Sequence, residues 1–114
     1  MSFDWKSYLL LSEELIKRSE EACLRSSISR AYYGVFCIAR NKKGYKLHKG
    51  SNIHSKIIDE YKEDKTLQKV GWNLDELRRA RNCADYDDSR EIKKSMAESM
   101  LLLAKQVLKD LESI

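Results

Sequence analysis

One arginine stands where an apolar residue is expected. Near position 80 the apolar side chains recur every three or four residues, and Arg81 continues a stripe made by Val70, Leu74, Leu77 and Ala84. A guanidinium is always charged, and taking a charge out of water costs on the order of several kcal/mol unless it is paired and hydrogen-bonded. Arg81 therefore belongs to a buried polar network or lines a cleft that receives an anion.

Polar residues accompany Arg81 on the same predicted helix. Asp85 follows Arg81 by four residues and Arg78 by seven, so its carboxylate reaches a guanidinium along one helix face. Asn82 and Tyr86 add an amide and a phenol. These groups could satisfy one another in a buried polar network or line the cleft that receives an anion.

A second polar stripe runs along an earlier predicted helix, over residues 20–43. Ser26, Arg30, Tyr33 and Cys37 recur at helical spacing opposite an apolar face. If the two helices are neighbours, Arg30 and Tyr33 meet the first group and form a polar seam. The seam either fixes helix register as a buried ion-pair network or holds a ligand.

Charge is uneven along the chain, whose formal net charge is +4. Between Glu21 and Asp59 there is no acidic residue, whereas eight lysines and arginines lie there. Lys42, Lys43 and Lys46 lie in the densest part, a predicted helix end and loop, and such a stretch suits a phosphate backbone. A solvated loop that binds no nucleic acid is the open alternative.

The chain as a whole predicts an all-α fold. It has no proline and four glycines among 114 residues, too few for the tight turns of a strand-rich protein. The predicted caps are Asp4 for the first helix, Gly44 for the end of the second and Ser89 for the start of the fifth. Short links favour a four- or five-helix up-and-down bundle in a single domain, residues 1–114. Apolar periodicity places the helices at about 4–19, 20–43, 51–63, 66–86 or 73–86, and 90–112.

The remaining composition predicts a cytoplasmic protein with no membrane association. No cationic segment followed by an apolar run begins the sequence, and the longest apolar stretch, 32–39, is far shorter than the roughly 20 residues that span a bilayer. Cys23, Cys37 and Cys83 lack metal-ligand spacing. We therefore expect free, packed thiols and neither a disulfide, nor a metal, nor another cofactor.

Two segments resemble the HEPN domain family, named for higher eukaryotes and prokaryotes nucleotide-binding. They are SSISRAYYGVF at 26–36 and RNCADY at 81–86. More narrowly, an Arg-Ala-Tyr-Tyr segment paired with an Arg-x-x-Ala-Asp-Tyr segment resembles a small branch of stand-alone prokaryotic HEPN proteins. The resemblance spans nearly the whole chain.

The resemblance implies a homodimer whose motif arginines face a shared cleft. Many relatives are metal-independent RNA endonucleases, including toxins encoded beside a nucleotidyltransferase partner. Their arginine holds the scissile phosphate, and a histidine that follows it moves a proton as the ribose 2′-hydroxyl attacks. Here Arg81 and Asn82 match the arginine and its polar neighbour, but Tyr86, Asp87 and Asp88 hold the positions expected for histidine.

The missing motif histidine leaves the proton transfer without its usual carrier, since a phenol is a poor base at neutral pH. His48 and His54 are the only histidines, and they lie in or after the basic loop. Either could replace the motif histidine in trans across a dimer, but both are expected to be ordinary surface or loop residues.

Three functions remain open from the sequence. The first is an RNA endonuclease or interferase-like toxin that uses Arg81 with Asn82, Asp85 and Tyr86 in an altered site. The second is a non-catalytic RNA- or nucleotide-binding module. The third is a docking partner for a nucleotidyltransferase, in which the seam only stabilises the bundle. We favour a toxin-antitoxin-type homodimer with RNA as its target. The expected binding residues are Arg30, Tyr33, Arg78, Lys42, Lys43 and Lys46.

Overall fold

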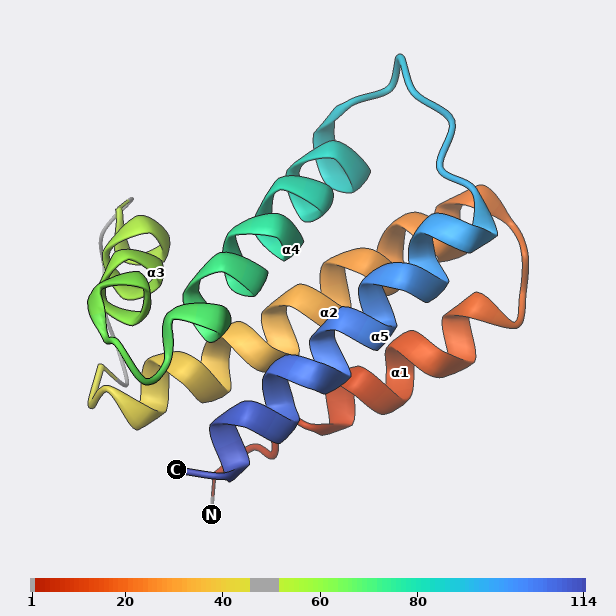
Figure 1. The fold of residues 1–114 in the computed structure, drawn as a ribbon. Helices are drawn as coiled ribbons and strands as arrows, with labels where there is room; N and C mark the ends of the chain where they lie inside the picture. Colours follow the sequence, from red (N-terminus) through yellow and green to blue (C-terminus); the bar gives the residue numbers. More distant parts are fainter. Residues whose placement is uncertain (1, 46–51) are drawn as a thin grey trace.

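Five α-helices are formed by the residues that the computed structural model describes, 2–45 and 52–114 (Figure 1). The predicted all-α bundle is therefore confirmed, in its five-helix form. The helices are α1 (Ser7–Ile16), α2 (Glu21–Lys42), α3 (Ile53–Glu63), α4 (Gln68–Tyr86) and α5 (Lys94–Glu112).

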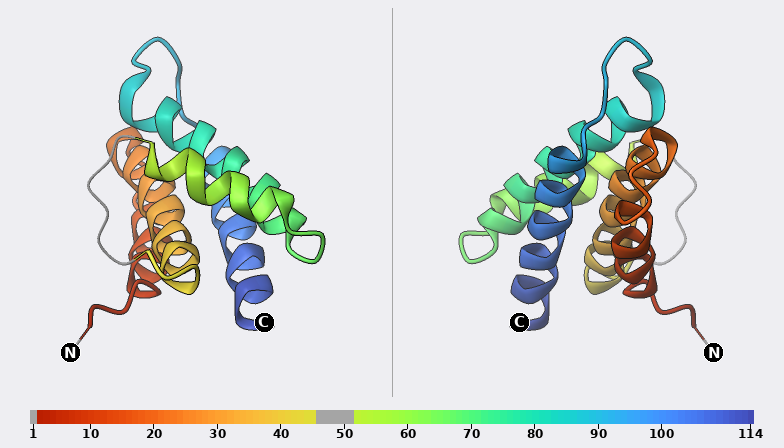
Figure 2. Two further views of the ribbon diagram at one scale, coloured as in Figure 1. Left: turned by 90° about the vertical axis from the view of Figure 1, so that its left-hand side faces the viewer. Right: turned by 90° about the vertical axis from the view of Figure 1, so that its right-hand side faces the viewer.

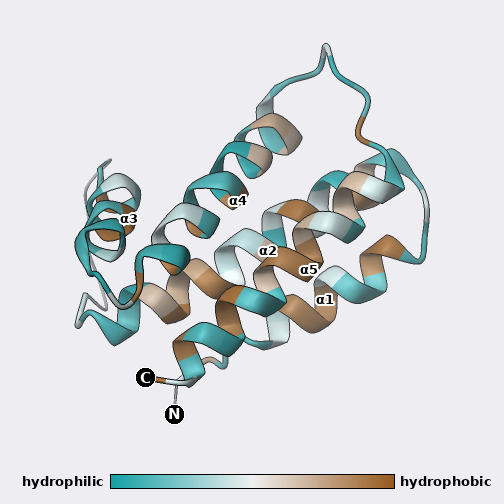
Figure 3. Cartoon of the chain, viewed as in Figure 1, coloured by the Kyte–Doolittle hydropathy of each residue, from teal (hydrophilic) through white to brown (hydrophobic). Residues whose placement is uncertain are grey.

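The central helix is α2, which contacts α1, α4 and α5. Ala31, Tyr32, Val35 and Ala39 on this helix are fully shielded from solvent. α1 and α5 lie alongside α2, whereas α4 crosses the bundle and packs against α3 (Figures 1 and 2). Hydrophobic stretches of α1, α2 and α5 lie side by side, while the face of α4 seen in the same view is mostly hydrophilic (Figure 3).

The ends of α1 lie inside the predicted range, and local hydrogen bonding explains why. The Asp4 carboxylate accepts the Lys6 N–H at 3.0 Å, so Asp4 holds a turn that precedes the helix rather than its first residue. Ser19 adopts φ 61°, a left-handed conformation that stops the helix after Ile16. The end of α2 agrees with the prediction, because Gly44 has φ 86° and its N–H donates to Asn41 O at 3.0 Å.

Gly71 lies inside α4, which begins at Gln68. A Cβ at this position would lie 2.5 Å from the backbone nitrogen of Lys62. The missing side chain lets α4 pass close to the end of α3.

The predicted start of the fifth helix was wrong by about four residues, because α5 begins at Lys94. Two acidic side chains hold the preceding segment in a non-helical conformation. Asp87 accepts the Ser89 N–H at 3.0 Å, so Ser89 is part of a turn and does not cap a helix. Glu21 accepts the Ile92 N–H at 3.1 Å, which ties the segment to the start of α2.

Candidate functional site

Arg81 points into the protein, as its place in the apolar stripe predicts. It is 8% exposed, and Val70, Leu74, Leu77 and Ala84 on the same face of α4 are also buried. These apolar neighbours pack against the bundle and turn the guanidinium toward α2. α2 and α4 are therefore the neighbours that the polar-seam prediction requires.

The guanidinium of Arg81 bridges the two helices. Its Nη2 donates to the hydroxyl of Tyr33 on α2, and its Nη1 donates to Asn82 Oδ1 at 2.6 Å. Its Nε lies 3.6 Å from Asp85 Oδ2, beyond hydrogen-bond distance, and has no hydrogen-bond partner among the described residues. Nε is thus the one guanidinium nitrogen of Arg81 that makes no hydrogen bond within the described residues.

The carboxylate of Asp85 is shared with α2 through a serine. Asp85 Oδ2 accepts a hydrogen bond from Ser29 Oγ at 3.1 Å, and the same Oγ accepts one from Arg30 Nη2 at 3.4 Å. The sequence prediction placed Ser26 in the seam, but Ser26 is exposed and Ser29 is buried. The serine of the seam therefore lies three residues later on α2 than expected, whereas Arg30 and Tyr33 take part as predicted.

Aromatic rings lie near the guanidinium groups of Arg81 and Arg30. The ring centroid of Tyr33 lies 4.9 Å from Arg81 Cζ and 5.4 Å from Arg30 Cζ. Tyr86 adds a ring 5.7 Å from Arg81 Cζ, although its side chain is largely exposed. Such ring faces attract cations, but they carry no net charge and do not neutralise them.

Arg78 extends the positive charge toward α3. It is half-buried and, within residues 2–45 and 52–114, makes neither a hydrogen bond nor an ion pair. Its charge acts on Tyr32 and His54: burial is the main cause of the raised pKa of Tyr32, which Arg78 opposes, and of the lowered pKa of His54, to which Arg78 adds. We call the group of Arg30, Arg78 and Arg81, with Tyr33 and Asp85, the cation site.

The expectation for His54 was wrong, because this imidazole is half-buried beside the cation site. Its Nδ1 lies 2.6 Å from the Tyr32 hydroxyl oxygen, and its ring stacks on Phe36 with centroids 4.3 Å apart. Burial, followed by the charges of Arg78 and Arg81, lowers the pKa of His54 to about 4. The imidazole is therefore neutral at pH 7.

Burial dominates the electrostatics of Tyr32, which is fully shielded from solvent. It raises the pKa of this phenol far above its usual value, against the opposing charges of Arg78 and Arg81. Tyr32 therefore remains a neutral hydroxyl that can hold the imidazole of His54.

The lysines predicted to bind nucleic acid lie apart from the cation site. Lys43 follows Tyr33 by ten residues, which is about 15 Å along a helix. Lys42 is exposed, and Lys43 Nζ lies 4.7 Å from the ring centroid of Tyr61. Lys46 and His48 lie outside the described residues.

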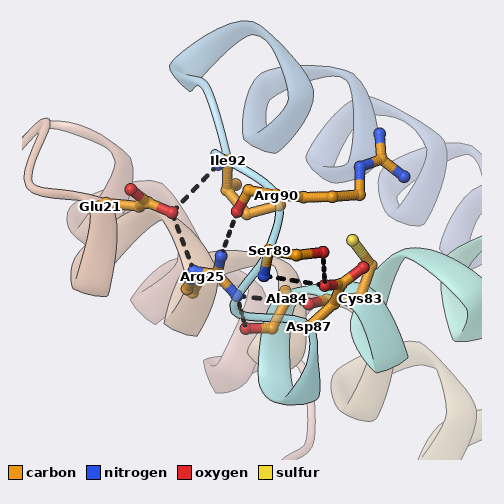
Figure 4. Close-up of polar contacts among 8 residues, drawn as sticks. All are labelled: Glu21, Arg25, Cys83, Ala84, Asp87, Ser89, Arg90 and Ile92. Carbon is orange, nitrogen blue, oxygen red and sulfur yellow. Dashed lines mark hydrogen bonds and ion pairs between the residues drawn. The ribbon is translucent and has the colours of Figure 1, made fainter.

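Arg25 fixes the end of α4, where Asp85 and Tyr86 are carried (Figure 4). It donates to the carbonyl oxygens of Ala84 at 2.9 Å and Cys83 at 3.3 Å, and also to that of Arg90. Glu21 holds Arg25 Nε at 3.0 Å. Because the last carbonyls of a helix have no partner within it, these contacts anchor α4 to α2.

The backbone bond from Ile92, followed by the charged bond from Arg25, lowers the pKa of Glu21, so this carboxylate stays ionised at neutral pH. The sequence reading missed this group, since nothing in the spacing of Glu21 and Arg25 indicates a partner about sixty residues away.

A family model described as the HEPN domain matches residues 12–114. The chain belongs to the HEPN family. No significant match was found among curated proteins or among solved structures. The cation site of this HEPN protein is built from both segments on which the sequence resemblance rests. Arg30 and Tyr33 lie in the first segment, and Arg81 and Asp85 lie in the second.

Other features of the HEPN chain lie away from the cation site. A concavity of about 450 Å³ between α4 and α5 is lined by Met96, Met100 and Ala80, among others, and includes none of the cation-site residues. Across the described ranges no His, Cys, Asp and Glu side chains gather into a metal-binding group, and no helix is long and apolar enough to cross a membrane. All three cysteines are free.

Proposed function

We propose that this HEPN protein binds RNA and holds a phosphodiester at the cation site. The observation that supports this most is a charge imbalance, because the cation site has three guanidinium groups but one carboxylate, that of Asp85. A phosphodiester supplies the missing negative charge. Planar guanidinium groups bind phosphate oxygens through paired hydrogen bonds, and Arg78, which has no hydrogen bond or ion pair within the described residues, has capacity for them.

A polymer of phosphates fits the wider surroundings better than a single nucleotide does. Tyr86 is 75% exposed beside Arg81 and offers a ring on which a base can stack. Lys42 and Lys43 lie about 15 Å farther along α2 and extend the positive charge. The choice of RNA over DNA rests on the HEPN resemblance and not on a contact of the site.

The proposal includes a homodimer and a toxin-antitoxin-type role, both taken from the same resemblance. Tyr86 stands at the exposed edge of the cation site, and a second copy seated there would cover it. Light scattering at micromolar concentration should give twice the 13.4 kDa of one chain. A monomeric mass would contradict the dimer.

Binding of a single-stranded RNA, measured by fluorescence anisotropy without divalent metal, tests the proposal. Arg78→Gln should weaken binding about tenfold, equivalent to about 1.4 kcal/mol, because it removes a cation of the site. Arg79→Gln is the matched control: it removes the same charge from the next residue, whose guanidinium pairs with Asp75 at 2.7 Å on the exposed side of α4. We expect it to change affinity less than twofold.

Equal affinities for the wild type and Arg78→Gln would contradict the assignment of the site. Absence of RNA binding by the wild type would contradict the proposed function and favour the alternative, a docking partner for a nucleotidyltransferase. Co-purification with such a partner would then be independent of Arg78.

A further inference from the structure

His54 meets one structural need, since its Nδ1 lies 2.6 Å from the buried hydroxyl of Tyr32, but its Nε2 has no hydrogen-bond partner within the described residues. His54 sits in the first turn of α3, and its ring stacks on Phe36 with an interplanar angle of 17°. The stack on Phe36 and the bond to Tyr32 leave the second ring nitrogen, Nε2, without a structural role. Burial first, and then the charges of Arg78 and Arg81, lower the pKa of this imidazole to about 4. An unfavourable placement of this kind is typical of a functional residue.

The imidazole and the guanidinium of Arg81 share their neighbours on α2. Tyr33 contacts His54 edge-on, with ring centroids 5.9 Å apart, and its hydroxyl accepts the hydrogen bond from Arg81. Tyr32, the preceding residue, binds His54 Nδ1. Tyr32 and Tyr33, adjacent on α2, therefore lie next to both the histidine from α3 and the arginine from α4.

We propose that His54 is the proton-transfer residue of the cation site and acts as a general base in metal-independent cleavage of RNA. This inference rests on the proposed function, because it requires a phosphodiester at Arg78 and Arg81. His54 then supplies, from α3, the group that the segment after Arg81 lacks.

The contacts of the ring assign a role to each nitrogen. Nδ1 is occupied by the Tyr32 hydroxyl at 2.6 Å, while Nε2 makes no hydrogen bond within residues 2–45 and 52–114. When Nδ1 carries the proton and donates it to the Tyr32 oxygen, Nε2 presents a lone pair. This is the arrangement of a base oriented by a second group.

The step balances without a metal or a co-reactant other than water. Nε2 of His54 accepts the proton of the ribose 2′-hydroxyl, and the 2′-oxygen attacks phosphorus. The bond from phosphorus to the 5′-oxygen breaks, and that oxygen takes a proton from water. A 2′,3′-cyclic phosphate and a 5′-hydroxyl result, and His54 returns its proton to solvent.

Binding of the substrate should adjust the basicity of His54. Arg78 and Arg81 from α4, and Tyr32 and Tyr33 from α2, are the titratable groups that face the ring. Of these, the arginines lower its proton affinity. A phosphodiester bound between them offsets their charge, so the imidazole becomes a stronger base when the substrate is present.

Cleavage of RNA in the presence of EDTA, with His54→Asn and His48→Asn, tests the inference. The Asn side chain can keep the bond to Tyr32 and removes Nε2. We expect His54→Asn to cleave 10²- to 10⁴-fold more slowly, to lose the acid limb of the pH–rate profile, and to bind 2′-O-methyl RNA within twofold of the wild type. His48→Asn, the matched change at the other histidine, should cleave at the wild-type rate.

Cleavage by His54→Asn at the wild-type rate and with the wild-type pH profile would overturn the inference. So would a wild type that binds 2′-O-methyl RNA but leaves unmodified RNA intact in EDTA, a result that keeps the proposed RNA binding. No binding of either RNA would overturn both proposals.

A second measurement needs no variant at the site. An NMR titration of the wild-type imidazole, with and without 2′-O-methyl RNA, should show the pKa of His54 rising by at least one pH unit on binding. An unchanged pKa would place the phosphodiester elsewhere and overturn the inference.

Discussion

Arg81 is buried among partners that satisfy it only partly. Its guanidinium reaches Tyr33 and Asn82, but the nearest carboxylate oxygen, on Asp85, stands 3.6 Å from Nε. Buried ion pairs with incomplete hydrogen bonding contribute little net stability, because desolvation cancels much of the attraction. At this position the charge is therefore better explained by a ligand than by the stability of the bundle.

Replacing Arg81 tests the two readings of the polar seam. Arg81→Met keeps the volume and fills the apolar stripe, so we expect the free energy of unfolding in urea to change by less than about 1 kcal/mol, while RNA binding is lost. Leu77→Ala, on the same face of α4, should lower the free energy of unfolding by about 2–5 kcal/mol and serves as the reference for a buried residue. A loss above about 3 kcal/mol in Arg81→Met would show a network that fixes helix register.

His54 makes stability depend on pH in a defined window. Its pKa is about 4 in the folded protein and near 6.5 in a model peptide, so between these values the unfolded state binds a proton that the folded state does not. Stability should fall as pH falls from 7 to 5, by about 1 kcal/mol after allowance for solvent screening of the half-buried ring. Urea unfolding of the wild type and His54→Asn at both pH values measures it, and equal pH responses would contradict the shift.

Sequence periodicity predicted the direction of the Arg81 side chain, but it did not predict the half-buried position of His54. The stripe from Val70 to Ala84 fixed the direction of Arg81, because both lie on one helix. His54 also has the helical spacing of Ile57, Ile58 and Tyr61, all buried, and that spacing was the available signal. Its proposed role depends on contacts with Tyr32 and with the arginines of α4. No pattern within α3 predicts these contacts.

At the scale of elements, α4 is held at both ends by contacts that its own sequence does not contain. Gly71 allows the close crossing with α3, and Arg25 caps the carbonyls at the other end. Apolar periodicity predicted where helices form, but the start of α5 could not be predicted, since a carboxylate on α2 keeps Ile92 out of the helix. Helix ends set by tertiary hydrogen bonds are the part of this fold that composition and spacing leave open.

The crossing of α3 and α4 makes a prediction about Gly71. In an open helix, Gly→Ala raises stability by about 1 kcal/mol. Here Gly71→Ala should lower the free energy of unfolding by about 1–3 kcal/mol, because the new Cβ meets the backbone of Lys62. Gly34→Ala is the control, with its nearest contact at 3.2 Å, and it should lose less in the same urea titration. An equal or smaller loss in Gly71→Ala would contradict the close crossing.

The cap on α4 makes a second prediction. Arg25→Ala leaves the carbonyls of Cys83 and Ala84 without their donor and should cost about 2 kcal/mol, with faster amide hydrogen exchange at Ile92. Arg18→Ala, which removes an exposed arginine paired with Glu20, should cost less than about 0.5 kcal/mol. Similar losses in both variants would show that Arg25 is only a surface charge.

For the molecule as a whole, the bundle gathers its positive charge from distant segments. A stretch of α2 without acidic residues faces the arginines of α4, and α3 adds a neutral imidazole between them. The sequence predicted the α2 and α4 parts, because each is an uninterrupted helical stripe. The distance of Lys42 and Lys43 from the cation site follows from the length of α2, because these lysines lie about 15 Å beyond Tyr33 along the helix axis.

The salt dependence of RNA binding tests the central claim, that the cation site holds phosphate, most directly. The affinity of the wild type should fall steeply as salt rises, and the double variant Arg30→Gln, Arg78→Gln should bind weakly with a slope of log affinity against log salt reduced by about 1–2. Arg79→Gln should keep the wild-type slope. A wild-type slope near zero, or an unchanged slope in the double variant, would contradict the claim.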